Sequence, residues 1–140
     1  MATAKPEEVR IGTPPADGLP LQVIRTAAAT ALMETLEAKH GLLMFHQSGG
    51  CCDGSSPMCY PRGEFLVGDG EVLVGVLGET PFYMSGSQFE YWKHTQLILD
   101  VVPGRGGMFS LEGPEGVRFL IRSRVFTNGE IAALREAGRI

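Results

Sequence analysis

The chain of 140 residues has few cysteines, few aromatic residues and little basic charge. Its 12 Lys and Arg are outnumbered by 16 Asp and Glu, which gives a net charge of −4. Proteins that bind a phosphate backbone normally carry a basic patch, so we expect no nucleic-acid partner. No apolar run reaches membrane-spanning length, and the N-terminus lacks the apolar stretch of a secretory signal. We therefore expect no membrane association and a cytoplasmic location.

All 3 cysteines lie within one short stretch, HQSGGCCDGSSPMC, which begins at His46. Thiols so close together cannot staple a fold, and a reducing cytoplasm favours metal or redox chemistry for them. The glycines and DGSSP form turns, so the stretch is predicted to be a loop after the strand LLMFHQS. Thiolates and imidazoles are typical ligands of zinc and iron. The sequence predicts a zinc or iron site formed by Cys51, Cys52 and Cys59, with His46 as the candidate fourth ligand.

Several interpretations of this stretch stay open. The pattern C-C-x6-C is not a standard zinc-ribbon spacing, so the set fits an open site or a site completed by a second subunit. The cysteines could instead be small buried apolar residues, and His46 a hydrogen-bonded core histidine. A thiol-based redox protein or enzyme would use Cys51 or Cys52 as its nucleophile and the other as the resolving thiol. An interaction module would need no metal. No residue is assigned a catalytic role.

Two weaker features remain. Trp92 and His94 lie together in YWKHT and could line a ligand pocket, although aromatic residues at helical spacing are more often core. Arg118, Arg122 and Arg124 alternate with apolar residues along a predicted strand. We expect them to form a solvated strand face, the alternative being a site for an acidic partner.

The order of predicted elements indicates an α+β domain with a mainly antiparallel sheet. Residues 1–20 carry four prolines and are predicted to be a flexible arm, followed by one domain over residues 21–140. The domain is predicted to begin with a helix over residues 21–41 and to end with a short helix whose capping box is Thr127 and Glu130. Hairpins are predicted around GDG at 68–70 and around GPEG at 113–116, and a short helix with Ser87 as its cap.

From about Leu21 the chain resembles a bacterial family known only as domain of unknown function 779. The motifs that carry the resemblance are HGLLMFHQSGGCCDGSSPMC, YMSGSQFEYWKHTQLILDV and GMFSLEGPEGVRFLIRSRVF. The resemblance implies no activity. Members are often encoded beside aldehyde or alcohol dehydrogenases, which implies an accessory role in that metabolism and a dehydrogenase as a partner.

The helix, strand and SGGCCDG turn are also distantly similar to the start of the HesB-like iron–sulfur carriers. That similarity implies a mixed sheet folded on itself, with Cys51 as the first ligand. The carriers have a Cys-Gly-Cys pair near the C-terminus, which is absent from the tail TNGEIAALREAGRI. We also expect a homodimer, because short antiparallel sheets with exposed edges often pair them.

Overall fold

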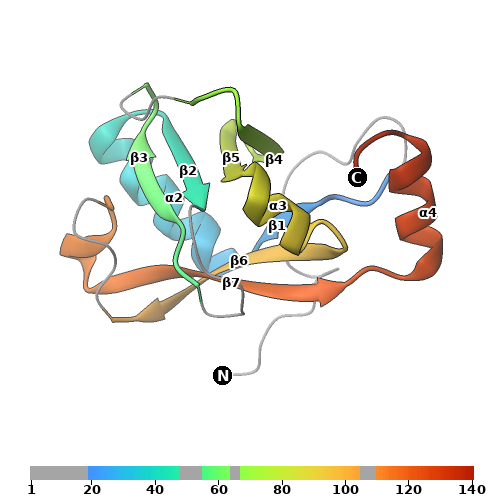
Figure 1. The fold of residues 1–140 in the computed structure, drawn as a ribbon. Coiled ribbons are helices and arrows are strands. Elements are labelled where there is room, and N and C mark those ends of the chain that lie inside the picture. Colours follow the sequence, from blue (N-terminus) through green and yellow to red (C-terminus); the bar gives the residue numbers. More distant parts are fainter. Residues whose placement is uncertain (1–18, 48–54, 64–66, 105–109) are drawn as a thin grey trace.

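A computed structural model describes residues 19–47, 55–63, 67–104 and 110–140 of the chain (Figure 1). The predicted α+β class is confirmed, and no helix in these ranges is long and apolar enough to cross a membrane. The strands are β1 (Val23–Arg25), β2 (Leu43–Gln47), β3 (Met58–Pro61), β4 (Glu71–Leu77), β5 (Thr80–Ser85), β6 (Thr95–Pro103) and β7 (Val117–Val125). The helices are α2 (Ala27–His40), α3 (Gly86–Trp92), α4 (Asn128–Glu136) and the short 3-10 helix η1 (Gly113–Glu115).

The strands form two mixed sheets, with the orders β3-β2-β5-β4 and β1-β6-β7. The pairs β1–β6 and β2–β5 are parallel, and the pairs β2–β3, β4–β5 and β6–β7 are antiparallel. At one side the sheets meet where β4 packs against β1, since a Cβ at Gly75 would lie only 2.7 Å from Val23 Cγ1. At the other side Ile121 of β7 donates its backbone N–H to the carbonyl of Ser55, ahead of β3, at 2.8 Å. The sheets thus enclose one core between them.

The core is filled by α2 and by the inner faces of both sheets. Helix α2 buries Ala29, Met33 and Leu36. Phe45 of β2 packs edge-on against Phe119 of β7, with ring centroids 4.9 Å apart. This geometry is favourable for aromatic pairs and joins the two sheets directly.

The predicted first helix is wrong in its first part. Residues 23–25 form β1, which runs parallel to β6. The β-branched Val23 and Ile24 are almost completely buried in this strand and favour it. The helix begins after Thr26, whose side chain accepts a hydrogen bond from the N–H of Ala29, and it ends at Gly41 as expected.

The second strand of each predicted hairpin, β4 and β7, is found with another partner, while the expected first strands at 64–68 and 108–112 lie partly outside the described residues. Strand β4 pairs with β5 across a turn at Gly78, whose φ of 65° suits glycine. Strand β7 pairs with β6 along all nine residues of each strand. The residues GPE of the expected turn form the 3-10 helix η1. Helix α3 is capped by Ser85, which accepts from the N–H of Gln88, and not by Ser87. Residues 64–66 and 105–109 lie outside the described ranges.

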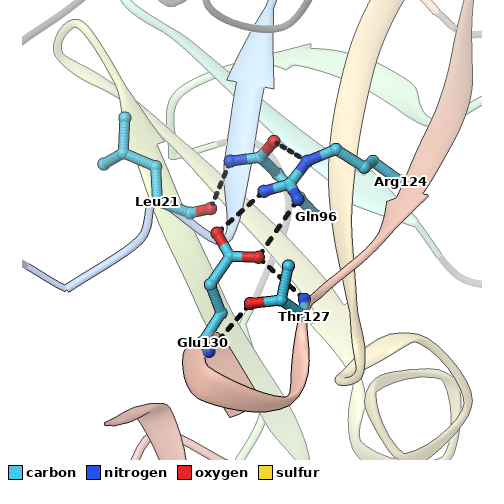
Figure 2. A network of polar contacts seen from close by, with 5 residues as sticks. All are labelled: Leu21, Gln96, Arg124, Thr127 and Glu130. Carbon is cyan, nitrogen blue, oxygen red and sulfur yellow. Dashed lines mark hydrogen bonds and ion pairs between the residues drawn. The ribbon is translucent and has the colours of Figure 1, made fainter.

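Helix α4 is held to the β1-β6-β7 sheet by a network of polar contacts (Figure 2). Arg124 donates to both carboxylate oxygens of Glu130, at 3.1 and 3.0 Å, and to the side-chain oxygen of Gln96 at 3.2 Å. Gln96 in turn donates to the carbonyl of Leu21 at 2.8 Å. The predicted capping box of Thr127 and Glu130 is confirmed.

The arginine face of β7 is therefore not simply solvated. Arg122 donates to Asp100 on the neighbouring strand at 2.9 Å, and Arg118 donates to Ser56. Burial by itself raises the pKa of Asp100. Hydrogen bonds from Arg122, Val101 N–H and Thr26 outweigh burial and hold that pKa below its usual value.

Candidate functional site

The outer face of the β3-β2-β5-β4 sheet, on the side away from the core, carries His46. Strand alternation sets this placement, because the neighbouring Phe45 points into the core. His46 is opposite Met58 in β3 and Tyr83 in β5, so these three side chains share the outer face. His46 is the next-to-last residue of β2 and is only 4% exposed.

Glu71 reaches the same place from the far edge of the sheet. It is opposite Ser85, which lies two residues after Tyr83 in β5 and so points to the same face. The carboxylate extends across β5, and Glu71 Oε2 lies 3.0 Å from His46 Nε2. The His46 side chain is 5% exposed and that of Glu71 is 18% exposed. An imidazole nitrogen and a carboxylate oxygen thus meet in a largely water-excluded position.

The contact is short, but it is not an aligned hydrogen bond. Glu71 Oε2 is fully buried and accepts no hydrogen bond from any residue that the structure describes. A buried carboxylate oxygen normally accepts at least one, so a buried oxygen beside a ring nitrogen is a feature that needs an explanation.

Cys59 lies on the other side of the same sheet. It pairs with Phe45 and is fully buried in the core with Phe82 and Phe119. Burial, and then the nearby charge of Glu112, strongly raise the pKa of this thiol. Cys59 is therefore a protonated core residue, and the structure does not bring it together with His46.

The backbone around Cys59 is fixed by a chain of hydrogen bonds. Its N–H donates to Ser110 Oγ at 2.8 Å, and Ser110 donates to the buried carboxylate of Glu112. The N–H of Phe119 reaches the other oxygen of Glu112 at 3.3 Å. These contacts join β3 to β7 and hold Cys59 in its core position.

Cys51 and Cys52 lie outside the described residues, so their roles as ligands stay predictions. In sequence they follow His46 by five and six residues. Across the described ranges, no three His, Cys, Asp or Glu side chains gather closely enough to hold a metal ion. A metal at His46 and Glu71 would need ligands from elsewhere in the chain.

The second candidate pair, Trp92 and His94, is not brought together in one pocket. Trp92 is 6% exposed and belongs to the core. The gap that it lines with Met84 and Leu97 is too small to hold a water molecule. His94 is exposed, and its carbonyl accepts from the N–H of Phe126. Trp92 is thus a core residue, which is the more common role for an aromatic residue at helical spacing.

Glu71 is the residue of this site that sequence reasoning did not find. It follows a turn at Asp69-Gly70 and has no motif around it. Its position beside His46 depends on the strand order β2-β5-β4, which no local pattern encodes.

The comparisons with known proteins agree with the motifs quoted above. No match is found among curated proteins. A family model described as "Domain of unknown function (DUF779)" matches residues 32–125, which include His46, the three cysteines and Glu71. Since the match covers more than half of the chain, the protein belongs to the DUF779 family.

Proposed function

We propose that the protein binds one zinc or iron ion, with His46 and the thiolates of Cys51 and Cys52 among its ligands, and serves as a metal-binding accessory protein. The observation that carries the proposal is the buried His46 side chain at the end of β2, 3.0 Å from a carboxylate oxygen. An imidazole in such a place is suited to hold a first-row metal ion.

The chain order adds support. Strand β2 ends at Gln47, and the two cysteines follow within five residues of that end. Imidazole and thiolate together are ligands that zinc and iron accept. Cys59 is left out of the proposed ligand set because it faces the core, on the opposite side of the sheet from His46.

The accessory role is proposed from the resemblance alone, with an aldehyde or alcohol dehydrogenase as the partner and a homodimer as the working assembly. Co-purification of the chain with the dehydrogenase would test the partner. A variant with Cys51→Ser and Cys52→Ser should lose the metal, and its retention of the dehydrogenase would show that docking and metal binding are separate.

Elemental analysis of protein purified without a chelating tag tests the metal. We expect about one zinc or iron ion per chain. His46→Gln should lose the ion, while the exposed His94→Gln serves as the matched control and should keep it. Metal far below one ion per chain in both aerobic and anaerobic preparations of the unaltered protein would contradict the proposal.

A further inference from the structure

We infer that two copies of the chain associate through the outer face of the β3-β2-β5-β4 sheet, which forms the interface of a homodimer. The inference rests on the homodimer of the proposed function and not on its metal ion. The four strands lie side by side (Figure 1), and the outward side chains alternate with core residues along each of them. The apolar members of this face that matter here are Leu42, Tyr60, Leu73, Val76, Pro81 and Tyr83.

The register of the strands gathers exposed apolar side chains on this face. Leu73 of β4 is opposite Tyr83 of β5, and Val76 is opposite Pro81. Leu42 comes directly before a core residue of β2, so it points to the same face. The side chains of Leu42, Leu73 and Val76 are each about half exposed. Large apolar side chains that share one exposed sheet face are typical of an interaction surface.

The edges of the two sheets offer less to a second copy than this face does. Along β3, the N–H and the carbonyl of Cys59 are already hydrogen-bonded to residues 110–111. Along β7, the N–H of Ile121 donates to the carbonyl of Ser55. The edges of β1 and β4 meet each other at Gly75. Because the edge strands are occupied at these points, a dimer formed by pairing of edges is disfavoured.

The charges on the face favour a second copy of the chain as the partner. Among the described side chains of this face, the carboxylate is that of Glu71, which lies 3.0 Å from the ring nitrogen of His46. The chain has a net charge of −4, so two copies repel each other where their surplus carboxylates meet. Exposed carboxylates such as those of Glu34, Glu90 and Glu136 lie on the helices. A face without surplus charge lets two copies approach, and it offers nothing to select a partner of opposite charge.

The size of the face sets the strength of the dimer. Four strands about 4.8 Å apart span about 19 Å, and strands of 5–7 residues are about 17–23 Å long. These dimensions give about 300–450 Å² of flat surface per copy. With the relief of the side chains, two copies come close to the total of about 1,000 Å² that a specific interface requires. A two-fold axis between the faces makes the contact isologous, and we expect a reversible dimer with a micromolar Kd.

Sedimentation velocity over about 1–200 μM, a range that brackets a micromolar Kd, tests the inference on protein treated with a chelator. Leu42→Lys and Leu73→Lys each bury two lysines per dimer, so each should raise the dimer Kd at least about 30-fold. Leu42 precedes the central strand β2, so its effect also separates face packing from pairing through the β4 edge. Val125→Lys changes an exposed apolar side chain on the other sheet and is the matched control, which should leave the dimer Kd unchanged.

Four results would overturn the inference. The first is a monomer at every concentration, and the second is a dimer that Leu42→Lys and Leu73→Lys leave unchanged. The third is a dimer that Val125→Lys weakens equally. The fourth is a dimer that forms only after zinc or iron is added, since the ion would then hold the copies together. A chain that dimerises but binds no metal would refute the metal proposal alone. Circular dichroism checks that each variant is folded, as expected for substitutions of half-exposed side chains.

Discussion

Replacing Cys59 separates its place in the core from a role in metal binding. The side chain is fully buried beside Phe45 and Phe119, on the opposite face of the sheet from His46. Serine would put a hydroxyl where the thiol packs among apolar groups, whereas alanine would leave a small cavity. Neither change reaches the outer face of the sheet.

The expected cost follows from burial. A hydroxyl buried without a full set of partners costs about 1–3 kcal/mol. Removal of the sulfur in Cys59→Ala costs about 1–2 kcal/mol in lost apolar burial and cavity formation. Domains of this size are stable by about 5–15 kcal/mol, so both variants should remain folded at 25 °C.

Urea unfolding and cobalt titration on the same preparations provide the assay. Both variants should show a lower urea midpoint, with an unchanged dependence of the free energy of unfolding on urea concentration. Their cobalt Kd should lie within about threefold of that of the unaltered protein. A folded Cys59→Ala with more than tenfold weaker cobalt binding would place Cys59 at the metal and refute the reasoning. A free energy of unfolding equal to that of the unaltered protein would refute its core position.

Three further predictions concern the fold. The first uses a variant with Cys51→Ser and Cys52→Ser, in which Cys59 is the remaining thiol. A thiol reagent at pH 8 should modify Cys59 at least about 10³-fold more slowly in the native protein than in urea, because the reaction requires opening of the core. Equal rates would contradict the burial of Cys59. Hydrogen bonds from Arg124 hold the pKa of Glu130 below its usual value, so Glu130 stabilises the fold above its unfolded pKa of about 4.3 and less as pH falls through the folded pKa. Because Glu130 is partly exposed, Glu130→Gln should cost about 1 kcal/mol at pH 7 and less at pH 3, measured by urea unfolding; a pH-independent cost would speak against the ion pair. Gly75→Ala should lower the free energy of unfolding by about 1–3 kcal/mol, because its Cβ would come within 2.7 Å of Val23 Cγ1; a thermal midpoint equal to that of the unaltered protein would contradict the close contact of β4 with β1.

Much of the local structure could be predicted from the sequence, because the signals were local. The capping box of Thr127 and Glu130, the helix end at Gly41 and the apolar strand β2 each depend on neighbouring residues. The errors came where pairing between segments far apart in the sequence decides the secondary structure. The residues VIR fit a helix by composition, but they are held as β1 by a parallel neighbour more than 70 residues later. A turn signal at GPEG likewise did not reveal that β7 pairs with β6.

The candidate site shows the same limit. The position of His46 near the end of a strand, shortly before Cys51 and Cys52 in the sequence, followed from local patterns. The assignment of Cys59 to the same site did not allow for strand alternation and pairing, which turn Cys59 toward Phe45 and the core. Glu71 could not be found from sequence, because it reaches His46 only through the order of three strands.

X-ray absorption at the metal edge of the loaded protein is the most direct test of the proposed site. The proposed ligands His46, Cys51 and Cys52 predict a mixed shell, with about two sulfur atoms near 2.3 Å and at least one nitrogen or oxygen atom at 2.0–2.2 Å. A shell of sulfur alone, or one of nitrogen and oxygen alone, would contradict it.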